Sequence, residues 1–221
     1  MVIGAVFDWD GVIVDSSVPH EQSWERLAAE EKRALPVGHF KRSFGMKNER
    51  IIPGILNWTD EPAEVHRLSL RKEELYRVIV TESGLSPLPG VKIFLARLAD
   101  AGIPCVVGSS THRLNIETAL EMMGLRPFFR DLVTAEDVSH GKPDPEVFLT
   151  AASRIGRRPA ECIVFEDAHV GIEAGRAGGF RVVGVAGTHP RETLTGAHRI
   201  VDRLDELEIE DLARLLGSDS G

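Results

Sequence analysis

The sequence predicts an α/β protein in which an open parallel β-sheet carries an inserted all-helical domain. From residue 90 onward, short apolar or β-branched runs alternate with segments of helical periodicity, a pattern typical of parallel strands joined by helices. The segment from residue 17 to residue 83 has helical spacing and no convincing strand. With 221 residues, the chain is long enough for a core that holds a smaller insertion.

Six runs are candidate strands. We expect strands where apolar residues run without interruption, and weaker ones near Leu132 and Ile200; the stronger runs are residues 2–7, 104–108, 162–165 and 181–185. Such runs predict strands that are buried on both faces. We therefore expect a doubly wound parallel sheet, with helices on both faces and right-handed crossovers.

Two helices of this region have clear signals. An apolar stripe with a 3.6-residue period covers residues 91–98 and stops before Gly102. Asp144 and Pro145 have the residue types of an N-cap and a first helical position, and a second apolar stripe follows over residues 147–155. These helices are expected to connect neighbouring strands of the sheet.

The helical segment predicts a separate domain. Apolar residues recur at helical spacing over residues 24–28 and again from Val65 to Val78. We assign residues 1–16 and 84–221 to the core domain and residues 17–83 to a helical cap domain. Because the first strand ends at Asp8, the cap should leave and rejoin the core at the sheet edge where ligands bind in such folds.

Composition limits the function classes. The net charge of −8 is spread along the chain without a basic stripe, which argues against nucleic acid or an anionic membrane as partner. No apolar run is long enough to cross a bilayer, and the N-terminus lacks the pattern of a secretory signal. We expect a cytoplasmic, monomeric protein whose partner is a small molecule.

The first strand runs directly into two acids, Asp8 and Asp10. Burying carboxylates at the end of an apolar strand is unfavourable unless a positive charge meets them. A divalent cation would do so, and Mg²⁺ suits a site with few carboxylates. Taken alone, the pair fits equally well a solvated turn before Gly11.

Polar residues also follow three later strands. Ser109, Ser110 and Thr111 offer hydroxyls and backbone amides that could hold phosphate oxygens, although serines also cap helices. Lys142 stands at a turn ahead of a helix. Glu166 and Asp167 precede a glycine-rich helix that could pack closely on the sheet. Alternatively, the two acids could serve only to interact favourably with the positive end of the helix dipole. The joint occurrence of these groups at four strand ends favours one shared site.

This ordered set resembles the haloacid dehalogenase superfamily, in the branch with a helical cap. The resemblance rests on the motifs FDWDGVIVDS, VVGSST, GKPDPEVF and VFEDAHVGIEAGRAGG, and with the insertion it covers nearly the whole chain. It implies a Rossmann-like core and a Mg²⁺-dependent phosphatase that forms an aspartyl phosphate. The roles it implies are a nucleophile (Asp8), a general acid and base (Asp10), phosphate binders (Ser109, Lys142), and metal ligands (Asp8, Asp167, the backbone carbonyl of Asp10), with Glu166 supporting the metal.

Within that superfamily, the cap resembles β-phosphoglucomutase and related sugar phosphatases, at positions such as His20, Gly45 and Lys72. The mutase places an arginine where this chain has Asn48, and the basic residues nearest to that position are Lys47 and Arg50. After Ser109, the mutase has lysine and asparagine where this chain has His112 and Arg113. These departures favour a phosphatase for a sugar or polyol phosphate.

Substrate contacts are expected at eight positions, namely His20, Gly45, Lys47, Asn48, Arg50, Lys72, Ser110 and Arg113. His20 and Lys72 could equally be exposed polar residues on cap helices. Two other functions stay open. One is a phosphomutase that moves phosphate within a hexose phosphate. The other is a phosphate-ligand binding module without turnover. The first would give an isomerised phosphate, and the second would bind phosphate compounds without hydrolysing activated esters.

Overall fold

A computed structural model describes residues 2–43 and 46–217. Within these residues, six parallel strands form one sheet in the order β3-β2-β1-β4-β5-β6. The strands are β1 (Gly4–Phe7), β2 (Cys105–Gly108), β3 (Phe129–Val133), β4 (Cys162–Glu166), β5 (Arg181–Val185) and β6 (Arg199–Val201). The strand order reverses beside β1, since β2 and β3 extend on one side of it and β4 to β6 on the other. The expected α/β fold is confirmed.

Helices surround this sheet and form the insertion. The described helices are α1 (Ser17–Glu30), α2 (His39–Ser43), α3 (Asn48–Gly54), α4 (Pro62–Ser83), α5 (Val91–Asp100), α6 (Arg113–Met123), α7 (Glu146–Arg154), α8 (His169–Ala177) and α9 (Ile209–Gly217). None of the described helices combines the length and the apolar character needed to cross a membrane.

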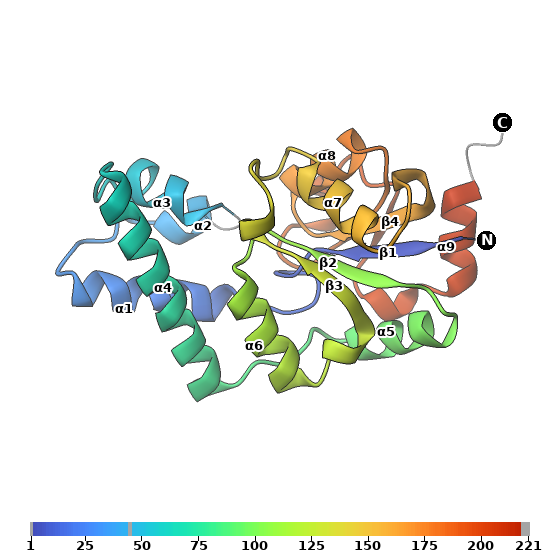
Figure 1. The fold of residues 1–221 in the computed structure, drawn as a ribbon, viewed down its shortest axis with the longest axis horizontal. Coiled ribbons are helices and arrows are strands. Elements are labelled where there is room, and N and C mark those ends of the chain that lie inside the picture. The colour runs from blue at the N-terminus through green and yellow to red at the C-terminus, as the bar shows by residue number, and fades with distance from the viewer. Residues whose placement is uncertain (1, 44–45, 218–221) are drawn as a thin grey trace.

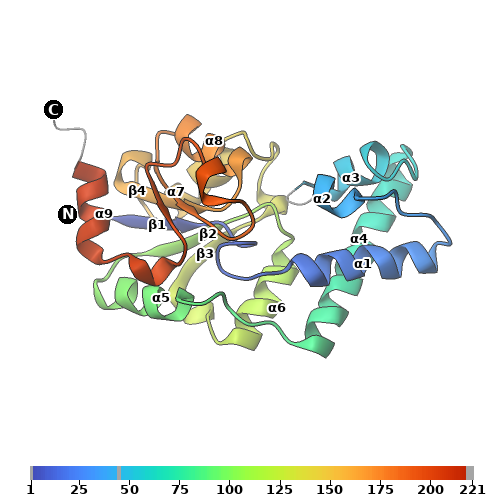
Figure 2. The ribbon, with the colours of Figure 1, turned by 180° about the vertical axis from the view of Figure 1, so that it is seen from behind.

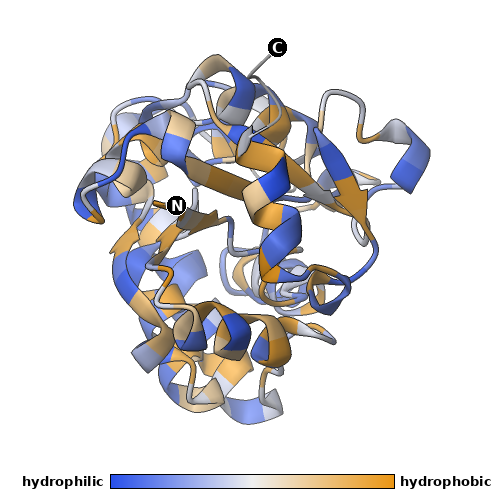
Figure 3. Cartoon of the chain, turned by 90° about the vertical axis from the view of Figure 1, so that its right-hand side faces the viewer, coloured by the Kyte–Doolittle hydropathy of each residue, from blue (hydrophilic) through white to orange (hydrophobic). Residues whose placement is uncertain are grey.

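The sheet is buried on both faces, as a doubly wound fold requires. Along β1, Ala5 and Phe7 pack in one apolar cluster with α5, α6 and α9, and Val6 packs in a second cluster with α7 and α8. Figure 1 shows α7 and α8 on one side of the strands and α5 and α6 on the other. In Figure 3, apolar colouring is concentrated on the central strands and on the helix faces turned toward them.

Helices α1 to α4 stand apart from the sheet, at the end opposite both termini (Figures 1 and 2). They enclose their own apolar cluster, which includes Trp24, Leu27, Ile52 and Leu68. The two chain segments that connect this insertion to the core run side by side, because Val14 bridges Pro87 and the amide of Leu88 donates to the carbonyl of Ile13, 2.8 Å away. Both connections therefore lie at the carboxyl end of β1.

Several element boundaries differ from the sequence prediction. Helix α7 begins at Glu146, one residue later than expected; the Asp144 carboxylate accepts the hydrogen bond of the Glu146 amide, 2.9 Å away. Residues 2 and 3 lie outside β1. Val78, which we placed on the apolar stripe of α4, is 44% exposed, and the buried face continues through Ile79 instead.

Candidate active site

The site begins where β1 and β4 end side by side. The two strands pair in parallel with Phe7 opposite Phe165, and the amide of Asp8 donates to the carbonyl of Phe165, 3.0 Å away. Asp8 therefore leaves the sheet next to Glu166. This is also where the strand order reverses, which is the usual ligand position in open α/β sheets.

Lys142 joins these two acids. Its Nζ lies 2.9 Å from Asp8 Oδ1 and 2.7 Å from Glu166 Oε1, and all three side chains are nearly inaccessible to solvent. Burial lowers the pKa of Lys142, but the two carboxylates outweigh it and hold that pKa above its ordinary value. The ammonium is therefore a fixed positive charge beside the Asp8 carboxylate.

Three carboxylates converge at this point, which gives the site an excess of negative charge over Lys142. Oxygen atoms of Asp8, Glu166 and Asp167 lie within 4.8 Å of one another. Asp167 Oδ2 is buried and has no hydrogen-bond partner among the described residues. A buried, unpaired carboxylate oxygen is unfavourable unless a cation meets it. The donor set therefore fits a divalent cation with oxygen ligands, as Mg²⁺ requires.

Two glycines allow this close approach. A Cβ atom at Gly11 would lie 2.0 Å from Asp167 Oδ2, and Gly11 has φ +76°, a conformation that favours glycine. A Cβ atom at Gly171, in the first turn of α8, would lie 1.7 Å from Glu166 Oε1. The glycine-rich helix predicted after Asp167 does pack closely on the strand ends.

Asp10 is held by hydroxyl groups from two directions. Its Oδ1 accepts a hydrogen bond from Ser16 and lies 3.7 Å from His20 Nε2, and its Oδ2 accepts from Thr111. Burial raises the pKa of Asp10, but His20, Ser16 and Thr111 together outweigh it and lower that pKa below its ordinary value.

Asp8 has the opposite shift. For the protein groups alone, burial raises the pKa of Asp8 to about 7, opposed by Lys142 and aided by Glu166 and Asp10. A cation bound by Asp8 would lower the pKa of that carboxyl, so the order of the two pKa values in the metal-bound enzyme stays a prediction.

The loop after β2 brings Ser109 and Ser110 to the same sheet edge. Ser109 is buried, its amide donates to the carbonyl of Val133 (2.9 Å), and its Oγ accepts from the amide of Thr111 (3.2 Å). Ser110 is partly exposed. Because β2 is the direct neighbour of β1, this loop lies beside Asp8 and Asp10.

The insertion contributes a chain of polar contacts that ends at Asp10. His20 Nδ1 lies 2.6 Å from Lys72 Nζ, which lies 3.1 Å from Glu73 Oε1. Asn48 Nδ2 donates to the same Glu73 oxygen, 2.6 Å away. Lys72 is 3% exposed, so the interpretation of this residue as a solvent-facing cap residue is wrong.

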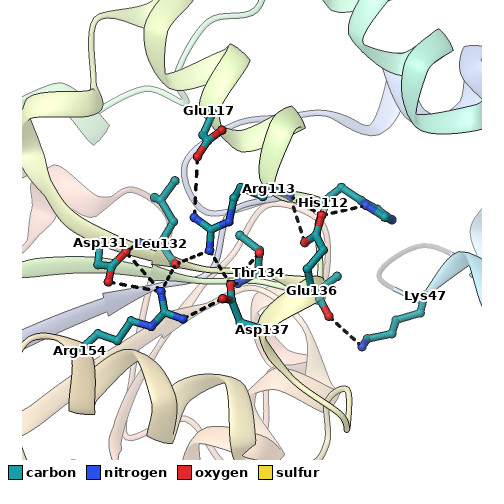
Figure 4. A network of polar contacts seen from close by, with 11 residues as sticks. Lys47, His112, Arg113, Glu117, Asp131, Leu132, Thr134, Glu136, Asp137 and Arg154 are labelled. Atoms are coloured by element: carbon teal, nitrogen blue, oxygen red, sulfur yellow. Dashed lines mark hydrogen bonds and ion pairs between the residues drawn. The ribbon is translucent and has the colours of Figure 1, made fainter. Parts of the chain in front are cut away.

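Other predicted contact residues have partners outside the acid cluster. Lys47 donates to the carbonyls of Ala135 (3.3 Å) and Val138 (3.4 Å), in the loop after β3. The guanidinium of Arg113 lies 2.6 Å from Asp137 Oδ2 and donates to the carbonyl of Leu132 (Figure 4). Arg50 is exposed, and Gly45 lies outside the described residues. The proposed contacts of these residues with substrate stay predictions.

The model of haloacid dehalogenase-like hydrolases matches residues 4–179, which include all four motifs. The chain belongs to this hydrolase family. The match confirms the family expected from the motifs and agrees with the site, because Asp8, Lys142, Glu166 and Asp167 meet in the fold as well as in the sequence pattern. The protein is therefore an enzyme of the hydrolase class.

Named relatives of the hydrolase family cover most of the chain. The 5-amino-6-(5-phospho-D-ribitylamino)uracil phosphatase of Arabidopsis thaliana is 39% identical over 98% of this chain, which spans 58% of that relative's length. Fructose-1-phosphate phosphatase YqaB of Escherichia coli is 32% identical over 82% of this chain and 95% of its own length. A solved β-phosphoglucomutase from Clostridium difficile superposes with a TM-score of 0.85 at 25% identity, over 99% of this chain and 98% of that one.

Two buried polar residues that are linked to the site could not be predicted from the sequence. Glu73 and Asn115 are both buried and hydrogen-bonded to each other between the insertion and the core. Neither belongs to a motif, and Glu73 is one of several acids on α4. Its helical spacing from Ser69 and Tyr76, both buried, is the only sequence signal that it faces inward.

Proposed function

We propose that this hydrolase is a Mg²⁺-dependent phosphatase that cleaves a small phosphate monoester through an aspartyl phosphate on Asp8. The observation that carries the proposal is the buried meeting of Asp8 with Lys142, Glu166 and Asp167 at the end of β1. Asp8, Asp167 and the Asp10 carbonyl would hold the metal, and Glu166 would support it. Bound there, Mg²⁺ offsets the repulsion between the Asp8 carboxylate and the phosphate.

In the first step, the Asp8 carboxylate attacks phosphorus and the bond from phosphorus to the leaving oxygen breaks. Lys142 and the Ser109 loop bind the phosphoryl oxygens and stabilise the charge that develops on them. Asp10 gives its proton to the leaving alkoxide. The dianionic phosphate placed beside Asp10 raises the pKa of Asp10, so substrate binding itself favours the protonated form.

In the second step, a water molecule attacks the phosphorus of the aspartyl phosphate. Asp10, now ionised, takes a proton from this water, the bond between Asp8 and phosphorus breaks, and inorganic phosphate leaves. Asp8 returns as a carboxylate and Asp10 is protonated again. One acid therefore serves both half-reactions, and Ser16 and Thr111 keep it in position through their hydrogen bonds.

We propose a sugar or polyol monophosphate as substrate. The two phosphatase relatives act, by their names, on a ribityl phosphate compound and on fructose 1-phosphate. Around the site, the charge of Lys72 is paired with Glu73, that of Arg113 with Asp137, and His112 lies 3.0 Å from Glu136. Cations already paired with acids are poor partners for a second phosphate group, which a phosphomutase must hold. Lys47 differs from these three, because it donates to two backbone carbonyls.

The experiment is a screen of the purified protein with Mg²⁺ against phosphorylated sugars, polyols and short acids. Released phosphate and isomerised product are both followed. Release from one compound class supports the phosphatase and identifies its substrate. Isomerised hexose phosphate without release would establish the mutase instead. Tight binding without turnover, even of p-nitrophenyl phosphate, would establish a binding module.

A further inference from the structure

Helix α4 of the insertion meets the core helix α6 at a buried asparagine. Asn115 lies in the first turn of α6 and is 1% exposed. The two helices lie side by side in Figure 1. A buried side-chain amide is unfavourable unless its nitrogen and its oxygen both have hydrogen-bond partners.

Both ends of the Asn115 amide bind residues of α4. Its Nδ2 donates to Glu73 Oε2, and its Oδ1 accepts a hydrogen bond from Arg77 Nη1, 3.0 Å away. Glu73 and Arg77 are four residues apart, so they lie on one face of α4. The acid needs a donor and the guanidinium needs an acceptor. An amide provides both, whereas a carboxylate or an aliphatic side chain at this position would not.

Glu73 depends on these donors, because an ionised carboxylate is costly to bury without them. Burial raises the pKa of Glu73, but Lys72 and other partners outweigh it and lower that pKa to about 2, so the side chain is an anion at neutral pH. Its Oε1 accepts from Lys72 and Asn48, and its Oε2 accepts from Asn115. Removing the Asn115 donor would therefore force this carboxylate, or the helix that carries it, to move.

A movement of Glu73 would reach the reaction centre through two further contacts. Its Oε1 lies 3.1 Å from Lys72 Nζ, which lies 2.6 Å from His20 Nδ1. His20 Nε2 lies 3.7 Å from the carboxylate of Asp10. This series of contacts starts on α6 of the core, passes through α4 and α1 of the insertion, and returns to the core after β1. The position of α4 on α6 therefore bears on the surroundings of Asp10.

We propose that Asn115 is a positioning residue for the first step of the reaction. Its amide fixes α4 against α6 and thereby holds Lys72 and His20 in place beside Asp10, the proposed general acid. The inference rests on the proposed phosphatase function and deepens it, because it gives a role in proton transfer to a residue outside the four motifs.

The test compares kcat/KM for p-nitrophenyl phosphate and phenyl phosphate, two esters of similar shape. Phenyl phosphate releases the more basic oxygen, so its cleavage depends more on the proton from Asp10. Asn115→Asp removes the donor to Glu73 and keeps the acceptor for Arg77, which favours the ionised form of the new carboxylate. We expect the loss of kcat/KM to be about tenfold larger for phenyl phosphate than for p-nitrophenyl phosphate.

A merely structural role would lower kcat/KM for both esters equally, so an unchanged ratio of the two values would overturn the proposal. The matched control is Asn57→Asp, the same substitution at an exposed asparagine of the insertion, which should keep the wild-type ratio. A wild type that hydrolyses neither ester would instead refute the proposed function, and this inference with it.

An exchange of the two groups tests the pairing itself. In the double variant Asn115→Asp with Glu73→Gln, the amide lies on α4 and the carboxylate on α6, so donor, acceptors and net charge are all kept. Because the two residues are in contact, we expect the double variant to recover at least about threefold of the lost ratio. It should also fold if Asn115→Asp alone does not. A double variant no better than Asn115→Asp, in folding or in this ratio, would overturn the proposal.

Discussion

Asp8 and Lys142 show how burial and charge combine at the scale of single residues. The carboxylate is almost inaccessible to solvent, yet it lies 2.9 Å from a buried ammonium and close to two further acids. Such an arrangement keeps water away from the charged groups and strengthens every electrostatic interaction between them. It also means that small changes of charge or volume at these positions should have large effects on turnover.

Asp8→Asn should abolish phosphate release, by at least about a thousandfold, because an amide oxygen cannot replace the carboxylate as nucleophile. The substitution preserves volume and removes one of several crowded negative charges, so thermal unfolding followed by circular dichroism should show an unchanged or higher midpoint. Activity above a small fraction of the wild-type rate would rule out Asp8 as the nucleophile.

Gly171→Ala should displace Glu166, because the new Cβ atom would lie 1.7 Å from its Oε1. Displacement breaks the 2.7 Å contact with Lys142 and moves the carboxylate that supports the metal. We expect the Mg²⁺ concentration for half-maximal activity to rise by about tenfold or more.

The control for this change is Gly54→Ala in α3, where a Cβ atom meets nothing within 4 Å. Phosphate release is measured for both variants as a function of Mg²⁺ concentration, and only Gly171→Ala should need more Mg²⁺ than the wild type. An unchanged Mg²⁺ requirement in Gly171→Ala would show that Glu166 is not part of the metal site.

Residue types at strand ends could be predicted from the sequence, whereas their partners could not. Asp8 and Asp167 each follow a strand that the pattern marks, and the parallel pairing of β1 with β4 brings them together. Lys142 follows a predicted turn and reaches them from its loop. The sequence does not distinguish Thr111 from the two serines before it, and it does not distinguish Glu73 from the other acids of α4. Their roles depend on the rotation of α4 and on the path of the loop after β2, which tertiary packing decides.

At the scale of elements, Asp137 ties three parts of the core together. It accepts hydrogen bonds from Thr134 after β3, from Arg113 of α6 and from Arg154 of α7 (Figure 4). Burial raises the pKa of Asp137, but the Thr134 and Arg154 hydrogen bonds and the charge of Arg113 outweigh it and lower that pKa from 3.8 to about 2. A carboxylate with a lowered pKa in the folded state stabilises the fold only while it is ionised.

Asp137→Asn should therefore destabilise the protein at pH 7, by about 1–3 kcal/mol, because charge-assisted hydrogen bonds are replaced by weaker ones. The stabilisation from the carboxylate is complete above the unfolded-state pKa of 3.8 and is lost as the pH falls toward about 2. The difference between wild type and variant should shrink over that window. Urea unfolding at neutral pH and at several values below pH 4 measures it, and a difference that stays constant would contradict the assignment.

The positions of the helices and strands agree with the hydrophobic pattern. The differences lie at the ends of elements and in which side of α4 is buried. The stripes at residues 91–98 and 147–155 are buried as predicted. Asp144 accepts the hydrogen bond of the Glu146 amide, as the predicted N-cap would, although the helix itself begins one residue later than expected. The exposure of Val78 reflects the single apolar face of α4, whose position the period alone does not determine.

At the scale of the whole molecule, several contacts between described residues join the insertion to the core. The connections pair at Val14 and Pro87, α4 meets α6 through Glu73 and Asn115, and Lys47 reaches the loop after β3. The first of these lies at the carboxyl end of β1. The sequence predicted an insertion at this edge, but contacts between distant segments have no local signal.

Lys47→Met should loosen the third contact, because the ammonium of Lys47 donates to the carbonyls of Ala135 and Val138 across the boundary. We expect faster amide hydrogen exchange in peptides covering residues 135–138 and 46–50, while peptides from the sheet keep their wild-type rates. The control is Lys41→Met, at an exposed position of α2. Lys47 is also a predicted substrate contact, and the two roles are separable: a substrate contact alone would raise KM and leave exchange in the free protein unchanged. Faster exchange together with a higher KM would mean that Lys47 supports substrate binding by holding the insertion against the core.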